Sequence, residues 1–291
     1  MLRGPGQATW LRTLESERDN LSLAMDWAFR HDPDAAVRFA SALAYFWLIG
    51  RHRSAVRQRI AAAVDKARDT SPVNRGRMLT WPAMLGCVEG RTGEAAAQAG
   101  EARELSLAAG DQWGLALCEA VLGLAVGLRG EVREAGELLE SSRVGFGTAG
   151  DDWGMAIATM LYGFVTSFTA QHERGTALAR ESLDGFRAAG DPWGQTMSLE
   201  LLGVLARRRG AFAAAISAFE EALGVVRDLG LRDEVPFLLA DLGDLHVQLG
   251  DFETAAVLHK EALDLAQGTG ATDAAALARG GLALAARRQG D

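Results

Sequence analysis

The side chains that most often carry chemistry are few and scattered in this sequence. No two of its histidines stand at the His-x₃-His spacing that places metal ligands on one helix face. His172 and Glu173 are adjacent, so they point to different faces of a helix. The two cysteines, Cys87 and Cys118, are too few for a disulfide framework and favour a reducing cytoplasm. The five histidines are His31, His52, His172, His246 and His259.

Motifs for nucleotide chemistry and nucleophilic catalysis are also missing. A phosphate-binding loop needs Gly-x₄-Gly-Lys-Ser/Thr, but Lys66 precedes Ala67 and Lys260 precedes Glu261. No Ser-His-Asp or Cys-His arrangement stands in a supporting motif. We therefore predict a protein that is not an enzyme, with no metal and no cofactor.

Composition excludes several further classes of protein. The chain has 291 residues, 48% hydrophobic and 23% charged, which is typical of a soluble folded protein. A net charge of −8 argues against direct binding to nucleic acid or to an anionic membrane. There is no apolar run long enough to span a bilayer, and the first ten residues lack the apolar stretch of a signal peptide.

Glycines and their neighbours recur at a period of 40 residues. A five-residue pattern around them is copied as well, as Gly-Asp-x-Trp-Gly at 110–114, 150–154 and 190–194. Such self-similarity is the signature of a tandem array. One glycine series comprises Gly110, Gly150, Gly190, Gly230 and Gly270; the other, half a period away, comprises Gly50, Gly90, Gly130, Gly210, Gly250 and Gly290, with Ala170 in the one gap.

Each repeat predicts two helices and two turns. Between glycines the apolar residues recur at spacings of three and four, and a glycine past a helix adopts the left-handed conformation that ends it. Asp111, Asp151 and Asp191 follow the first series and can cap the next helix, which Pro192 then enters. First helices are expected near 34–49, 72–89, 112–129, 152–169, 192–209, 232–249 and 272–289, and second helices near 52–68, 92–108, 132–148, 172–188, 212–228 and 252–268.

Three further features of the repeat carry predictions. Small residues in one phase of each helix predict a close backbone-to-backbone approach: Gly123, Gly163, Gly203 and Gly243 in first helices, and Ala95, Ala135, Ala215 and Ala255 in second helices. Pro82 lies inside an expected helix and predicts a kink. A ladder of tryptophans at the same period is formed by Trp113, Trp153 and Trp193. We interpret it as structural, with each ring packed on the preceding hairpin in room left by the glycine that follows it. A ladder that stacks on a ligand is the alternative.

The array resembles the tetratricopeptide (TPR) family. The residues that match the TPR signature fully are Leu202, Gly203, Gly210, Phe212, Ala215, Phe219 and Ala222, and the next repeat matches with Leu242, Gly243, Gly250, Phe252, Ala255 and Ala262, with His259 at the second aromatic. The repeats at 110–149 and 150–189 are weaker matches, and the period exceeds the usual TPR length. Long repeats with Gly-Asp-x-Trp-Gly are similar to the C-terminal arrays of bacterial STAND-type regulators, including the maltose-regulon activator and antibiotic-pathway regulators.

The resemblance also implies which side chains meet a partner. In TPR proteins first helices line the concave surface, which here gives an apolar strip in one part of the array and a charged strip in the next. That combination suits a helical peptide or a small amphipathic ligand; the alternative is that many of these residues form inter-repeat core. The predicted groove residues are Leu124, Leu128, Met160, Phe164, Phe168, Met197, Glu200, Val204, Arg207, Arg208 and Asp244.

We predict an all-α, right-handed α-solenoid superhelix of about six to seven TPR-like hairpins. Residues 1–69 form a divergent helical segment with a first degenerate repeat. Residues 70–291 form the array, with repeats starting near 70, 110, 150, 190, 230 and 270, the last incomplete.

The segment containing Trp10 and Trp27 is similar to the helix that follows the ATPase and winged-helix regions of STAND regulators. The resemblance implies a cytoplasmic, non-catalytic sensor that binds a protein, a peptide or a small effector, as a fragment or split-off module whose ATPase and DNA-binding domains lie elsewhere. A freestanding TPR adaptor is the alternative.

Overall fold

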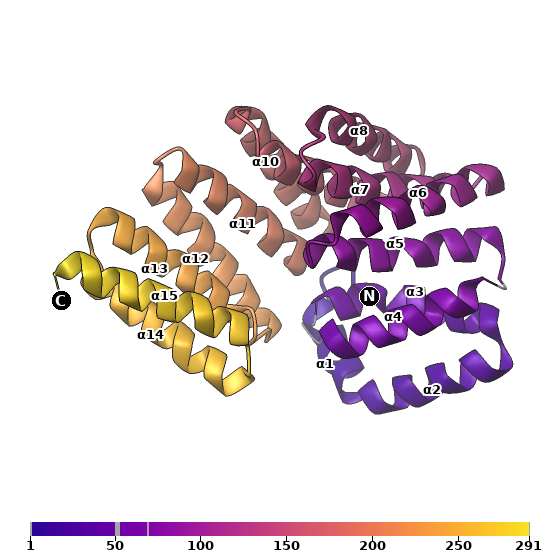
Figure 1. Ribbon diagram of the computed structural model, residues 1–291, viewed down its shortest axis with the longest axis horizontal. Coiled ribbons are helices and arrows are strands. Elements are labelled where there is room, and N and C mark those ends of the chain that lie inside the picture. Colours follow the sequence, from indigo (N-terminus) through magenta and orange to yellow (C-terminus); the bar gives the residue numbers. More distant parts are fainter. Residues whose placement is uncertain (1, 50–52, 69, 291) are drawn as a thin grey trace. The chain divides into compact units, whose positions relative to one another are not determined.

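The computed structural model describes residues 2–49, 53–68 and 70–290. Every regular element among these residues is a helix, which confirms the all-α prediction (Figure 1). The chain divides after Gly190 into two compact units. Unit 1 is Met1–Gly190 and unit 2 is Asp191–Asp291. The division falls at a repeat boundary inside the predicted array.

Unit 1 contains a leading pair of helices followed by four helical hairpins. The leading pair replaces the single helix expected there, because the chain turns at Glu17. The helices are α1 (Gln7–Ser16), α2 (Arg18–His31), α3 (Pro33–Ile49), α4 (Arg53–Ala67), α5 (Pro72–Val88), α6 (Thr92–Ala109), α7 (Gln112–Leu128), α8 (Val132–Thr148), α9 (Asp152–Thr166) and α10 (His172–Ala189).

Unit 2 contains two hairpins and one further helix. Its α13 begins later than expected, because residues 232–234 form a turn ahead of it and Pro236 occupies its first turn. The helices are α11 (Pro192–Arg208), α12 (Phe212–Leu229), α13 (Val235–Leu249), α14 (Phe252–Thr269) and α15 (Thr272–Gln289).

Neighbouring hairpins pack through their first helices. In unit 1, α3 contacts α5, α5 contacts α7, and α7 contacts α9, while α4, α6 and α8 also contact the first helix that follows each of them. In unit 2, α13 contacts both α14 and α15 in the same way. Stacking of this kind buries the apolar face that a single hairpin leaves open.

The turn chemistry follows the predicted pattern. The glycines that end α6, α10, α12, α14 and α15 have positive φ, as does Gly250 after α13. Asp111, Asp151 and Asp191 each accept a hydrogen bond from the backbone amide three residues on, at 2.9–3.1 Å.

Two residues that the sequence analysis named, Gly50 and His52, lie outside the described residues. The helix α5 continues without interruption through Pro82.

The nearest neighbours of the predicted helical glycines are side chains, which corrects the predicted backbone-to-backbone approach, although the Ala135 carbonyl oxygen also lies 3.3 Å from a Cβ built on Gly123. A Cβ at Gly203 would lie 2.7 Å from the ring of Phe219 in the second helix of the same hairpin. A Cβ at Gly123 would meet Leu139 at 2.7 Å, and one at Gly243 would meet His259 at 2.7 Å. In these three hairpins, a large residue of the second helix therefore lies directly on the backbone of the first helix.

This packing predicts opposite effects for two glycine-to-alanine substitutions in unit 2. Gly203→Ala should lower the free energy of unfolding by about 1–3 kcal/mol, because the new methyl group collides with the fully buried Phe219. Gly224→Ala in α12 should raise it by about 0.5–1 kcal/mol, because a Cβ there meets nothing and alanine favours the helix. Urea unfolding followed by circular dichroism measures both. Equal effects of the two substitutions would contradict the packing.

His259 occupies the position of Phe219 one repeat later and is fully buried, between Gly243 and Gly281. Neither of its ring nitrogens has a hydrogen-bond partner; the nearest acid, Asp244, has Oδ1 at 3.5 Å from Nε2. Burial lowers the pKa of His259 from the ordinary histidine value of 6.5, and the charge of Asp244 opposes that shift. The unfolded chain therefore binds the proton more readily than the folded one.

We expect the folded state to lose stability as the pH falls through 6.5, the pKa of an unfolded histidine, toward the lowered pKa of His259. His259→Phe should remove that part of the pH dependence. At pH 7 it should also raise the free energy of unfolding by about 1–3 kcal/mol, the usual cost of an unsatisfied buried polar group. Thermal unfolding between pH 5 and 8 tests this. An unchanged slope of stability against pH would show that another group dominates.

Candidate functional site

The C-terminal ends of the first helices in unit 1 present a row of apolar side chains. Val88 ends α5, Leu128 ends α7, and Phe168 follows α9, each 40 positions after the last. The rings of Phe164 and Phe168 meet edge-to-face at a centroid distance of 5.0 Å. Val88 and Phe168 are each 52% exposed, while Leu128 and Phe164 are half-buried. We call these four residues the apolar strip.

Two predicted groove residues of unit 1 do not reach this surface. Leu124 is 5% exposed and Met160 is 4% exposed, so both belong to the core. Their burial agrees with the alternative that part of the predicted strip is inter-repeat packing. Leu128, Phe164 and Phe168 are the predicted residues that a partner of unit 1 can touch.

The predicted charged strip lies in unit 2. Arg207 pairs with Asp241 of α13 at 3.1 Å, so this arginine links two first helices. Arg208 is exposed, and Asp244 lies beside the buried His259. Met197, Glu200 and Val204 are half-buried. The apolar and charged parts of the predicted surface thus belong to different units.

The aspartates that begin the first helices also connect successive hairpins. Asp111 accepts two hydrogen bonds from the guanidinium of Arg77 in α5, at 2.7 and 2.8 Å. Asp151 accepts a hydrogen bond from the indole Nε1 of Trp113 at 2.7 Å. The bond from Arg77 is the main reason that the pKa of Asp111 lies below its usual value. Each carboxylate therefore caps its own helix and accepts a hydrogen bond from a side chain of the preceding hairpin.

The tryptophan ladder is structural in part, but its contacts differ from those predicted. Trp113 packs edge-to-face on Phe146 of α8, its own hairpin, at 6.0 Å, and bonds Asp151 of the next one. From the preceding hairpin, the Arg77 guanidinium lies 5.0 Å from its ring centre. The space at Gly154 is taken by Phe146 and not by a tryptophan ring. Trp113, Trp153 and Trp193 all remain half-buried.

The thiols and histidines form no reactive cluster among the described residues. Cys87 and Cys118 are free and buried, and burial raises the pKa of their thiols to about 11 and about 12. Both therefore stay protonated at neutral pH and are poor nucleophiles. The described part of the chain holds no group of three or more His, Cys, Asp or Glu side chains arranged to bind a metal. None of its helices has the length and apolarity that crossing a membrane requires.

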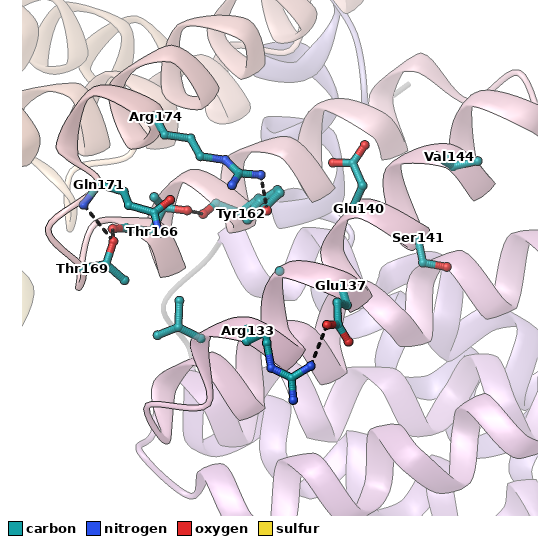
Figure 2. Close-up of a pocket in the computed structure, with 12 residues that line it drawn as sticks. Arg133, Glu137, Glu140, Ser141, Val144, Tyr162, Thr166, Thr169, Gln171 and Arg174 are labelled. Atoms are coloured by element: carbon teal, nitrogen blue, oxygen red, sulfur yellow. Dashed lines mark hydrogen bonds and ion pairs between the residues drawn. The ribbon is translucent and has the colours of Figure 1, made fainter.

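A cavity that the sequence did not indicate opens between α8 and α10, with α9 beneath it (Figure 2). Its volume of about 960 Å³ is in the range of small-molecule sites. The guanidinium of Arg174 lies 4.8 Å from the ring centre of Tyr162 and donates to its hydroxyl. Across the cavity, Arg133 pairs with Glu137 at 2.9 Å. The lining residues are Val132, Arg133, Gly136, Glu137, Glu140, Ser141, Val144, Tyr162, Thr166, Thr169, Gln171 and Arg174.

The missing glycine at position 170 explains part of this cavity. No described residue other than glycine has a positive φ, so Ala170 cannot end a helix as Gly130 and Gly210 do. The helix α9 ends at Thr166, earlier than the expected residue 169, and the chain turns through Thr169, whose hydroxyl donates to the Thr166 carbonyl at 2.7 Å. The early end places Phe168 in the turn and not in the helix. Gly136 adds space, because a Cβ there would meet the Tyr162 hydroxyl at 3.1 Å.

A second cavity of about 600 Å³ occupies the equivalent place two repeats earlier. Its floor includes Pro82, which stands 80 positions before Tyr162. Both cavities therefore open where the first helix carries a residue that departs from the repeat.

Solved structures with TPR arrays resemble this chain. A STAND protein with a tetratricopeptide-repeat sensor from Pyrococcus horikoshii superposes with a TM-score of 0.74 at 15% identity, over 96% of this chain and 42% of that one. NprR in complex with its cognate peptide NprX gives 0.60 at 13% identity, over 89% and 77% of the two chains. A Rap protein complexed with Competence and Sporulation Factor gives 0.64 at 10% identity, over 88% and 75%.

These similarities establish the fold as a TPR-type α-solenoid and confirm the resemblance seen in the repeat signature. This chain spans less than half of the STAND protein's length. No family model and no curated protein matches the sequence.

Two substitutions separate the roles of Asp111. Asp111→Asn keeps a capping oxygen for the Gly114 amide but removes the negative partner of Arg77, and should cost at most about 1 kcal/mol, because Arg77 is 40% exposed. Asp111→Ala loses the cap too and should cost about 1–2 kcal/mol more. Urea unfolding at pH 7 measures both.

The pH dependence gives an independent check on the same pair. Because the pKa of Asp111 is lowered in the folded state, its charge contributes stability above the unfolded pKa near 3.8, and that contribution is lost as the pH falls below it. The difference in the free energy of unfolding between Asp111→Asn and the wild type should therefore be smaller at pH 3 than at pH 7. If this difference stays constant from pH 7 to pH 3, the ion pair between Asp111 and Arg77 does not contribute to the stability of the fold.

Proposed function

We propose that this chain is a non-catalytic binding module that recognises a peptide, and that it forms the sensing part of a STAND-type transcriptional regulator. The observation that carries peptide binding is the apolar strip, in which two exposed and two half-buried apolar side chains stand at one end of three neighbouring first helices. Exposed apolar anchors in a row are what an amphipathic peptide requires. The partner is expected to contribute apolar side chains at helical or extended spacing.

The similar structures support this proposal. One is a STAND protein with a TPR sensor, and another binds its cognate peptide on the same type of fold. In a STAND parent, peptide binding to the array would bias an ATPase switch in another domain. The exposed Trp10 of α1 and the exposed Leu23 and Trp27 of α2 offer an apolar face on which such a domain could pack.

Two alternatives stay open and have distinct signatures. A small effector would occupy the cavity lined by Tyr162 and Arg174 instead of the apolar strip. A freestanding adaptor would bind a protein partner without any nucleotide-dependent response. A P-loop ATPase encoded in frame directly upstream favours the STAND regulator over the adaptor.

The test is a thermal-shift screen of the chain against peptides and metabolites, followed by titration calorimetry on each hit. A ligand present at 100 times its dissociation constant should stabilise the fold by about 2.7 kcal/mol. For a peptide hit, Phe164→Ala combined with Phe168→Ala should weaken binding by at least about tenfold, because truncated aromatic anchors typically cost more than 1 kcal/mol.

Leu107→Ala is the matched control. The exposed fraction of Leu107, 51%, is similar to the 52% of Phe168, but Leu107 lies on the second helix α6 of the same unit. Its truncation should leave the affinity unchanged. Equal affinities for the double variant, the control and the wild type would rule out the apolar strip as the binding surface. Loss of metabolite binding in Tyr162→Ala would favour the effector cavity instead.

A further inference from the structure

The segment that precedes α1 has a defined conformation on unit 1. Gln7 is fully buried, and its Nε2 donates to the carbonyl of Leu2 at 2.6 Å. The amide of Gln7 donates to the carbonyl of Gly4 at 3.0 Å, and Gly4 itself is buried. These bonds close residues 2–7 into a turn. The turn fixes the direction in which Arg3 leaves the backbone.

Arg3 lies among three aromatic rings drawn from three different first helices. Its guanidinium carbon is 3.9 Å from the ring centre of Trp153 in α9, 5.9 Å from Trp113 in α7 and 6.0 Å from Tyr45 in α3. Tyr45 and Trp153 meet edge-to-face at 5.0 Å, which closes the enclosure. Rings within about 6 Å attract a cation through their negative faces. We call Tyr45, Trp113 and Trp153 the aromatic cage.

The segment also fits the end of α10. A Cβ at Gly190 would lie 2.8 Å from Cδ of Pro5. Gly110, Gly150, Gly230 and Gly270 hold the same place in other repeats, and nothing lies within 4 Å of a Cβ built on any of them. Gly190 is thus the member of its series against which another part of the chain packs. The contacts of Arg3, Pro5 and Gln7 together show that residues 2–7 pack specifically on unit 1.

The electrostatic surroundings favour a cation. Asp111 and Asp151 stand two residues before Trp113 and Trp153, at the starts of the same helices. Asp151 accepts the Trp113 indole hydrogen, which holds one wall of the cage in place. The chain as a whole carries a net charge of −8. Asp111 is paired with Arg77, whose guanidinium also lies 5.0 Å from the Trp113 ring centre. The three electron-rich rings are therefore the main attraction for the Arg3 guanidinium.

We propose that the aromatic cage is a binding site for the arginine side chain of a partner peptide, and that residues 2–5 are a built-in occupant which this peptide displaces. The inference deepens the proposed peptide recognition and rests on it, but the cage lies at the N-terminal ends of α7 and α9, whereas the apolar strip lies at the C-terminal ends. A tethered occupant competes at a high effective concentration. The wild-type chain therefore binds an external arginine peptide weakly until Arg3 leaves the cage.

The test uses the peptide acetyl-Leu-Arg-Gly-Pro-Gly with a C-terminal fluorophore, a copy of residues 2–6, and measures its fluorescence anisotropy with the full chain. Arg3→Ala should bind this peptide at least about tenfold more tightly than the wild type, because it removes the competing guanidinium. The same peptide with citrulline in place of arginine is the matched control. It keeps the shape but not the charge, and it should bind Arg3→Ala at least about tenfold more weakly.

Substitutions in the cage complete the experiment. In the Arg3→Ala background, Trp153→Leu should abolish binding of the arginine peptide, with circular dichroism to verify that the variant is folded. If that variant is unfolded, Tyr45→Leu takes its place, with at least about a fivefold loss expected. The proposal is overturned if Arg3→Ala binds no more tightly than the wild type, or if the citrulline peptide binds as well as the arginine peptide.

The result of this experiment can be distinguished from the result of the test of the apolar strip. The Phe164→Ala, Phe168→Ala double variant should bind the arginine peptide normally when Arg3→Ala is also present. Binding of a screened peptide that depends on the apolar strip, without any binding to the cage, removes only this inference. Binding to the cage without any dependence on the strip relocates the recognition surface to the N-terminal ends of the first helices.

Discussion

The structure depends on one contact that recurs within its hairpins: a large side chain of the second helix lies on a glycine of the first. Leu139 on Gly123 and Phe219 on Gly203 are the apolar versions of this contact. Because the glycine carries no Cβ, the two helices approach closely while the large side chain stays fully buried. The spacing of the helices in a hairpin then sets where the next hairpin can stack, so the repeat of this contact carries the repeat of the fold.

Most of the fold follows from the sequence because local signals and packing signals share one period. Glycines with positive φ end the helices, and aspartates cap the next ones, at the places where the apolar spacing requires a turn. Predictions went wrong where that agreement ends. The absence of glycine at 170 shortens α9, and the turn before Val235 delays α13. The partner of the helical glycines was also misjudged, because periodicity marks a close approach but does not identify the atoms that fill the space.

The candidate site was less predictable than the fold. A helical period identifies which residues share a face, but burial depends on how far the neighbouring helix covers that face, which is why Leu124 and Met160 belong to the core while Phe168 is exposed. The cavity at Tyr162 depends on a change in the chain path after Thr166. The aromatic cage joins Arg3 and Tyr45 to Trp153 across a large separation in sequence. A period of 40 residues contains no information on such contacts, since Arg3 and Tyr45 do not take part in the tryptophan repeat.

The small side chains of α15 affect how unit 2 opens to solvent. This helix contributes less buried hydrocarbon of its own than α12, which buries Phe219 and Leu223. The buried residues of α15 are Ala274, Ala275, Ala278, Gly281 and Ala285. Gly281 covers the His259 imidazole, whose nitrogens are unsatisfied as long as that cover is in place. Fraying of α15 would let water reach both nitrogens and offset part of the lost packing. Amide hydrogens of α15 should therefore exchange through local opening, well before those of α11 and α12. The free energy of that opening should fall in mildly acidic solution, once the exchange rates are corrected for the slower intrinsic exchange of amides in acid.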